Sequence, residues 1–285
     1  MDGRAVARWT GLATRGPAAG VTTVFPDGWK GAWHAMRPPD REPDLDDTLF
    51  LSALSSHLEV VGAAESWPVF LAGISHGALF AEHVTRHGLL PVAGLFLVAG
   101  SALESSRRLA PAPRLHATMT LIMGTRDRVV PYQGGPLPRR GISGLVQRRR
   151  AARHGELPGE DVVAAANDIA VEWAAGNGIE APPRVDQLPG GPADPLVTRK
   201  TWTAPGCRPV TLYRVNDGGH GWPGAPPSPP PRAKPAGTKP PSTRPADTKP
   251  AASSLHSGGL DATALLLGMA ERESAIAAGY RTLER

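Results

Sequence analysis

Cysteine is nearly absent from this sequence, and long apolar runs are missing altogether. The single cysteine among 285 residues, Cys207, excludes an internal disulfide and a zinc cluster built on cysteine ligands. No apolar run is long enough to cross a bilayer, and residues 1–20 lack the apolar core of a signal peptide. The sequence therefore predicts no transmembrane segment and shows no route of export.

A large excess of charge of either sign is also lacking. Lysine and arginine number 31 against 26 acidic residues, which gives a formal net charge of +5. Several arginines gather between residues 139 and 153, where they form either a phosphate-binding patch or a solvated loop or helix face. No aromatic residues are interleaved with them to stack on bases, so we predict no binding of nucleic acid.

The length and the order of apolar segments favour one α/β domain that spans residues 1–285. Short apolar runs separated by helical or loop-like stretches predict a mostly parallel sheet with helices on both faces. The predicted strands are residues 21–25, 69–72, 92–98, 118–123 and 211–215. The predicted helices are residues 51–61, 78–87, 160–175 and 260–278, and residues 134–158 are predicted to form a loop. Residues 1–20 show no clear period.

Residues 223–257 differ in composition from the rest of the chain. They are rich in proline and hold almost no large apolar side chain, and the sequence Pro-Ala-Gly-Thr-Lys-Pro at 235–240 returns as Pro-Ala-Asp-Thr-Lys-Pro at 245–250. Such a segment cannot bury enough apolar surface to fold. Because a helical pattern resumes at Leu260, we interpret residues 223–257 as a disordered insertion within the domain and not as a tail.

A serine flanked by glycines directly follows the predicted strand at 69–72. The sequence Gly-Ile-Ser-His-Gly at 73–77 matches the pattern Gly-x-Ser-x-Gly, and a helix-compatible stretch follows it. In a nucleophile elbow the chain turns sharply from strand to helix, so the flanking positions must be nearly free of side chain. Ser75 is therefore a candidate nucleophile. The alternative is a chance match, because the chain is rich in glycine, alanine and serine.

Two further residues have the types and positions that a serine nucleophile needs, namely a histidine as base and a carboxylate that orients it. Asp127 follows the predicted strand at 118–123, and His220 lies in a glycine-flanked loop after the last predicted strand. The order Ser, Asp, His along the chain, each after a strand, is that of α/β-hydrolases. Each residue alone has a simpler interpretation as part of a turn, but together Ser75, Asp127 and His220 predict a catalytic triad.

Five short motifs are spread along the chain. They are Gly-Ile-Ser-His-Gly, Gly-Thr-Arg-Asp-Arg-Val-Val-Pro-Tyr, Gly-Gly-His-Gly-Trp-Pro-Gly, Phe-Pro-Asp-Gly and Leu-Asp-Ala-Thr. As a set they resemble the poly(3-hydroxybutyrate) depolymerase family of α/β-hydrolases, which includes feruloyl and related secreted esterases. The resemblance implies that Ser75 is the nucleophile, Asp127 the acid and His220 the base. It also places Tyr132 and Trp222 at motif positions beside the site, where they are candidates for substrate binding.

The chain departs from the family pattern near its beginning. By the resemblance, an earlier strand ending in a His-Gly loop supplies one backbone N–H of the oxyanion hole, whereas residues 1–20 show no such strand. The fold is thus expected to be N-terminally shortened and to have an exposed sheet edge, with the N–H of His76 as the remaining oxyanion donor. Family members often carry a cysteine after Asn-Gly that can pair with one near Cys207. Ile179 stands there instead, so Cys207 is expected to be unpaired.

The first hypothesis is a serine carboxylic-ester hydrolase without metal or cofactor, which acts on a polyhydroxybutyrate-type polyester or a feruloyl-type ester. Two alternatives stay open: a catalytically silent or shortened hydrolase-like protein that serves as a binding scaffold, and a related hydrolase that acts on a peptide or lactone. Many family members are exported, so the resemblance implies an extracellular location. The chain shows no signal peptide, which keeps a cytoplasmic location open.

Overall fold

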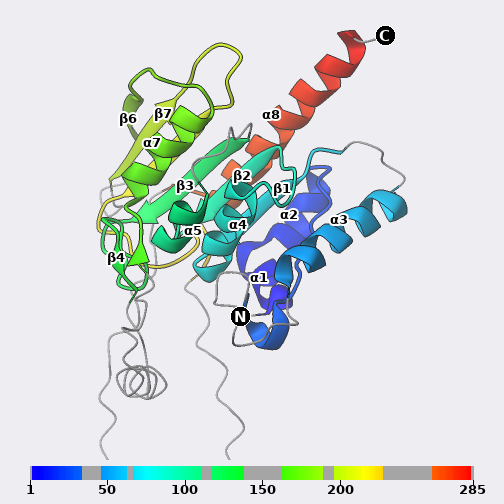
Figure 1. The fold of residues 1–285 in the computed structure, drawn as a ribbon, viewed down its shortest axis with the longest axis horizontal. Helices are drawn as coiled ribbons and strands as arrows, with labels where there is room; N and C mark the ends of the chain where they lie inside the picture. The colour runs from blue at the N-terminus through cyan, green and yellow to red at the C-terminus, as the bar shows by residue number, and fades with distance from the viewer. Residues whose placement is uncertain are drawn as a thin grey trace, which may run out of the picture.

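The computed structural model has a main sheet of six strands in the order β1-β2-β3-β8-β7-β6 (Figure 1). The parallel strands are β1 (Phe70–Ile74), β2 (Gly94–Val98), β3 (Thr118–Gly124) and β8 (Val210–Val215). The antiparallel strands at the other side are β7 (Val197–Trp202) and β6 (Arg184–Leu188). The structure describes residues 2–33, 46–62, 67–110, 117–137, 162–188, 196–226 and 259–283.

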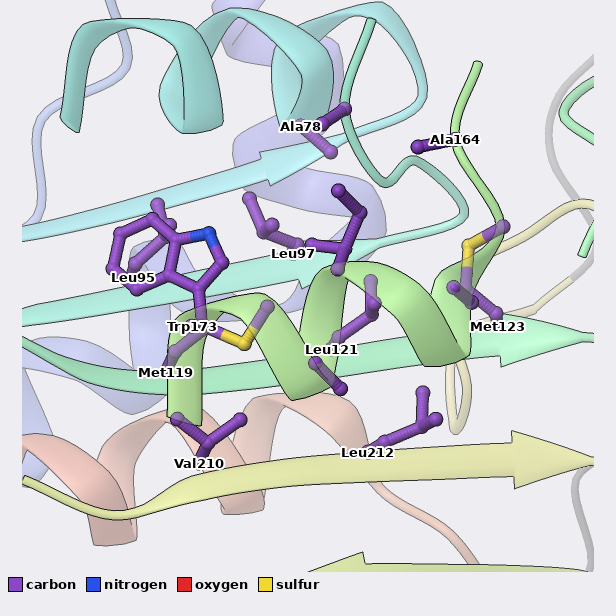
Figure 2. Packing of buried hydrophobic residues seen from close by; sticks show 14 of the residues in the cluster. Ala78, Leu95, Leu97, Met119, Leu121, Met123, Ala164, Trp173, Val210 and Leu212 are labelled. Carbon is purple, nitrogen blue, oxygen red and sulfur yellow. The ribbon is translucent and has the colours of Figure 1, made fainter. Parts of the chain in front are cut away.

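Helices cover both faces of this sheet. One face carries α4 (His76–Arg86) and α7 (Ala166–Gly176), and the other carries α1 (Gly3–Thr10), α2 (Leu12–Ala18) and α8 (Ala262–Leu283). Figure 2 shows α7 on the near side of the strands and α8 behind them. The remaining elements are η1 (Trp29–Gly31), α3 (Asp47–Gly62), α5 (Glu104–Leu109) and the antiparallel pair β4 (Gly135–Pro136) and β5 (Val162–Val163). The chain therefore has an α/β architecture with a mostly parallel sheet.

The central strands are buried on both faces, which explains their nearly uninterrupted apolar sequence. Every residue of β2 and β3 is buried. Leu95 and Leu97 belong to the cluster on the α7 face, together with Trp173 (Figure 2). Phe96 and Val98 belong to the cluster on the α8 face. Since successive side chains of a strand point to opposite faces, a strand between two helical layers needs apolar residues at nearly every position.

Most of the predicted elements are confirmed, with shifts of a few residues at their ends. The strands predicted at 69–72, 92–98, 118–123 and 211–215 correspond to β1, β2, β3 and β8, and the helices predicted at 51–61, 78–87 and 260–278 to α3, α4 and α8. The helix predicted at 160–175 is α7, which begins at Ala166 because residues 162–163 form β5 instead. Residues 1–20, which lack a clear period, hold α1 and α2.

The prediction of a strand at residues 21–25 is wrong. In the described part of the chain this segment pairs with no strand, and it packs on α1 and α2 instead. The Val21 N–H donates to Gly16 O at 2.9 Å, and a Cβ on Gly3 would lie 2.2 Å from Phe25 O. Because this segment does not join the sheet, β1 is the last strand of the sheet in the described part of the chain, in agreement with the predicted sheet edge.

The hairpin of β6 and β7 is absent from the sequence prediction. Its strands read Arg-Val-Asp-Gln-Leu and Val-Thr-Arg-Lys-Thr-Trp, so neither contains the apolar run that marks the central strands. Three predictions fall wholly or mostly outside the described residues: the arginine cluster between 139 and 153, the loop at 134–158 and the insertion at 223–257. Among the described helices, none is both long enough and apolar enough to cross a membrane.

Trp173 offers a test of the core between α7 and the sheet. It is fully buried, and its indole N–H donates to Glu82 Oε1 at 3.2 Å. We expect Trp173→Ala to lower the free energy of unfolding by about 3–5 kcal/mol, because it removes a large side chain and leaves a cavity. Val171→Ala, at a position of α7 that is 47% exposed, should change it by less than about 0.5 kcal/mol. Urea unfolding measures both values, and equal losses would contradict the placement of α7.

Candidate active site

Ser75 joins β1 to α4 in a strained backbone conformation. Its φ of 56° and ψ of −122° lie outside the regions that residues with a side chain ordinarily occupy. The Ser75 N–H donates to Val98 O (2.9 Å), and Ser75 O accepts from the N–H groups of Ala78 (3.0 Å) and Leu79 (3.1 Å). Strain of this kind persists only where the surroundings fix it, and it is concentrated at functional sites. The geometry is that of a sharp strand-to-helix turn.

The two glycines that flank Ser75 are not equally constrained. A Cβ on Gly73 would lie 2.3 Å from Gly77 O, so the close approach of α4 to β1 excludes a side chain there. Gly100, just after β2, is constrained in the same way, because a Cβ would lie 2.6 Å from Ser75 O. A Cβ on Gly77 would meet nothing within 4 Å. The prediction that both flanking positions must lack a side chain therefore holds for Gly73 and is wrong for Gly77.

Asp127 and His220 are in direct contact. Because an ionised carboxylate can only accept, His220 Nδ1 donates to Asp127 Oδ2, at 2.7 Å. The other carboxylate oxygen accepts from the N–H groups of Val129 (2.7 Å) and Val130 (2.9 Å). The Asp127 side chain is fully buried, whereas 22% of the His220 side chain is exposed. In the neutral imidazole tautomer with its proton on Nδ1, Nε2 is the acceptor nitrogen and can take up a proton.

The loops that carry these two residues are bonded to each other. The Arg126 N–H donates to Gly218 O (2.9 Å), and the Asp217 N–H donates to Thr125 Oγ1 (2.9 Å). A Cβ on Gly124 would lie 2.3 Å from Gly218 O, so the loops touch through their backbones. Sequence reasoning assigned no role to Thr125, although it lies in the motif that holds Asp127, or to Asp217, because a contact across 92 positions leaves no pattern in the sequence.

Ser75 lies at the same end of the sheet as this pair, where the parallel strands have their carboxyl ends, but it follows a different strand. β1, β3 and β8 are parallel, so the residues that follow them all lie at the carboxyl ends of the strands. β2 and β3 separate β1 from β8 in the sheet. Within the described ranges, the Ser75 hydroxyl forms no hydrogen bond with His220 or Asp127. Such bonds are often long in an enzyme without substrate. His76, the predicted oxyanion donor, is the first residue of α4 and follows Ser75 directly.

Tyr132 and Trp222 lie below the surface. Tyr132 is 7% exposed, and burial raises the pKa of its phenol, although the Arg214 guanidinium 5.8 Å from the ring lowers it. Trp222 is 3% exposed, its ring lies 5.9 Å from that of Phe96, and its indole N–H donates to Thr263 Oγ1 at 3.0 Å. Both side chains pack into the core, and their contact with a substrate stays a prediction.

Buried charges tie α4 to α7. Glu82 and Arg86 are fully buried, and Arg86 Nε donates to Glu82 Oε1 at 2.7 Å. Arg86 Nη1 also reaches Glu172 Oε1 on α7, at 2.5 Å. Burial raises the pKa of the Glu82 carboxyl, although the charge of Arg86 lowers it. Removing one member of such a group leaves a buried charge without its partner, so this network holds the helix that begins directly after Ser75.

A histidine of α4 and the histidine directly after α4 share one hydroxyl group of α5. His83 Nδ1 lies 2.9 Å and His87 Nε2 lies 3.2 Å from Ser106 Oγ. Burial, followed by the charges of His87 and Arg86, lowers the pKa of His83 to about 4. Burial also lowers the pKa of His87. Ser106 is only 3% exposed, so this contact between a serine and two histidines is closed to an external substrate.

The described residues include no cluster of three or more His, Cys, Asp or Glu side chains that could hold a metal ion. Cys207 is unpaired, as expected, with its Sγ 3.7 Å from Gly178 O. Comparison of the chain with protein-family models, with curated proteins and with solved structures gives no match.

The unequal glycines around Ser75 give a paired test of the turn. Gly73→Ala should destabilise the protein by about 1–3 kcal/mol, because its Cβ would push α4 away from β1. Gly77→Ala should instead stabilise it by about 0.5–1 kcal/mol, because its Cβ enters open space in the first turn of a helix. Urea unfolding measures both changes. Shifts of the same sign would show that the close contact lies elsewhere.

The lowered pKa of His83 predicts a loss of stability in mild acid. An unfolded histidine titrates near 6.5 and folded His83 near 4, so between these values the unfolded state binds more protons. The stabilising contribution is therefore full above about pH 6.5 and is lost as the pH falls toward 4. His83→Asn should flatten this dependence of the urea midpoint on pH, whereas His57→Asn, at an exposed position of α3, should keep it. A wild-type slope in His83→Asn would contradict the assignment.

Proposed function

We propose that the chain is a serine carboxylic-ester hydrolase with an α/β-hydrolase fold. The observation that supports this most strongly has two parts. Ser75 is strained at a strand-to-helix turn, and a buried Asp127 is bonded to His220 at the same carboxyl end of the sheet. A turn aspartate needs neither a fully buried carboxylate nor a histidine 2.7 Å away. The three residues also follow parallel strands in the chain order that this fold uses.

The proposed reaction has two steps, acylation of Ser75 by the ester and hydrolysis of the acyl-enzyme, and all three side chains act in both. Ser75 Oγ attacks the ester carbonyl while His220 Nε2 takes its proton, and Asp127 stabilises the imidazolium that forms. The alcohol leaves with the proton from His220, and a water molecule then hydrolyses the acyl-enzyme by the same route in reverse. Before the first step, the Ser75 hydroxyl must come within hydrogen-bond reach of Nε2.

The developing oxyanion needs a donor beside the nucleophile. The N–H of His76 is suited to this role because it opens α4, where the helix dipole favours negative charge. The resemblance expects the second donor on a strand that residues 1–20 do not contain, and loss of one donor typically costs on the order of a hundred- to a thousand-fold in rate. The proposed enzyme is therefore expected to be slow compared with esterases that have two donors.

The substrate and the location follow from the resemblance of the motifs. A polyhydroxybutyrate-type polyester or a feruloyl-type ester is the proposed substrate, with no metal or organic cofactor. An extracellular location belongs to the same proposal. The chemistry of the triad itself requires only an activated carboxylic ester.

A catalytically silent, hydrolase-like binding scaffold is the second candidate. Two observations favour it: within the described residues the Ser75 hydroxyl is not bonded to His220, and residues 1–20, which lack the strand that the resemblance expects to supply an oxyanion donor, hold α1 and α2 instead. Its buried Asp127 would then serve to hold the two loops together.

Removal of the Ser75 hydroxyl distinguishes the two candidates. The wild-type chain should hydrolyse p-nitrophenyl butyrate and react covalently with a fluorophosphonate probe. Ser75→Ala should lose the label and lower kcat/KM by on the order of 10⁴-fold, because the nucleophile is gone. Ser106→Ala is the matched control, since Ser106 Oγ lies within hydrogen-bond distance of two histidines but is buried, and it should keep both properties.

Mass spectrometry of the labelled protein locates the modified residue. A label on Ser75 alone supports the esterase. A label that persists in Ser75→Ala places the nucleophile elsewhere and contradicts the proposal. A wild-type protein that unfolds cooperatively but neither reacts nor turns over supports the silent scaffold.

A further inference from the structure

β1 leaves one row of backbone groups without a strand partner. The Ser75 N–H and the Val69 C=O both bond toward β2, so the odd-numbered residues of this segment face β2. Backbone groups alternate in direction along a strand, so Phe70, Ala72 and Ile74 direct their N–H and C=O groups to the other side. Within the described ranges, no backbone hydrogen bond to a residue outside the strands or helices reaches these groups.

The opposite edge of the sheet is protected by charge, and β1 is not. On β6, Arg184 and Asp186 pair at 2.9 Å, and Asp186 also pairs with Arg199 of β7 at 2.9 Å. β1 reads Phe-Leu-Ala-Gly-Ile and contains no charged residue and no proline. Charges and prolines are the usual means by which natural sheets block pairing at an edge. β1 is therefore the edge at which another strand can add.

Exposed apolar side chains occur in the segment before β1 and on α3. Trp67, three residues before β1, is 62% exposed, and Val60 and Val61 near the end of α3 are 80% and 68% exposed. Leu51 of α3 and Leu71 of β1 contribute to one apolar cluster. Apolar side chains gathered beside an open strand are typical of a protein interface.

We propose that β1 pairs with the β1 strand of a second copy of this chain, antiparallel and across a two-fold axis at Ala72. In that register Ala72 faces its own equivalent, and Phe70 faces the equivalent of Ile74. Residues whose N–H and C=O both point to the partner exchange two hydrogen bonds in such a pair, so every outward group of the strand is satisfied. The strand is thus complementary to itself, as a two-fold interface requires, and it carries no charge that would repel its copy.

Sedimentation velocity of the full chain tests this pairing. The wild type should form a dimer that dissociates on dilution. Ala72→Lys places a charge in the centre of the edge, at an exposed position, and should abolish the dimer. Val185→Lys places the same charge on β6, at a position that is 56% exposed, and should leave the dimer intact. Ser75→Ala should dimerise like the wild type, so this test does not depend on the proposed esterase activity.

Covalent capture gives a second, independent measurement. In a Cys207→Ser background, Ala72→Cys should be joined to its equivalent by a short bis-maleimide, because the residue lies on the axis, whereas Val185→Cys should not. A wild type that stays monomeric at every concentration overturns the proposal. A dimer that survives Ala72→Lys, or that is lost equally with Val185→Lys, also overturns it. Failure of Ala72→Cys to cross-link in a dimeric sample does the same.

Discussion

The parallel pairing of β3 with β8 is the contact on which the rest of the molecule depends. It joins segments that are distant in sequence, and its last pair, Gly124 with Val215, sets the level at which the loops that carry Asp127 and His220 leave the sheet. A slip of one residue would turn every side chain of β8 to the other face of the sheet. Leu212 would then point toward α8 instead of α7. The same slip would separate Asp127 from His220. The register that builds the core therefore also builds the acid–base pair.

What could be predicted from the sequence follows from where each strand lies. β2 and β3 are buried on both faces, so their apolar runs are plain, and Asp127 and His220 could be found by their positions after such strands. β6 and β7 lie at the charged side of the sheet and carry no apolar run, so they were not predictable from pattern alone. The β-branched run at 21–25 misled the prediction because its backbone bonds to α2, a tertiary contact that composition does not reveal.

The candidate site consists of two parts that are held separately. Asp127 and His220 are fixed by each other and by the contacts between their loops. Ser75 is fixed by β2 through Val98 and by α4, which the buried charges bind to α7. Strands lie about 4.8 Å apart, so three spacings place β1 roughly 14 Å from β8, and the loop after β8 must reach back across β3 and β2. The sequence predicts the members of the site but not this separation, because spacing along the chain does not fix the distance across a sheet.

The strand that ends in Ser75 is also the strand with the open edge. Among the described strands, β1 pairs with β2 alone, and its residues are only partly buried. The strain at Ser75 is maintained by the rigidity of what surrounds it. A second strand along Phe70, Ala72 and Ile74 would supply that rigidity from the open side. If β1 pairs with its own copy, assembly of the dimer and the geometry of the nucleophile are therefore linked through a single strand.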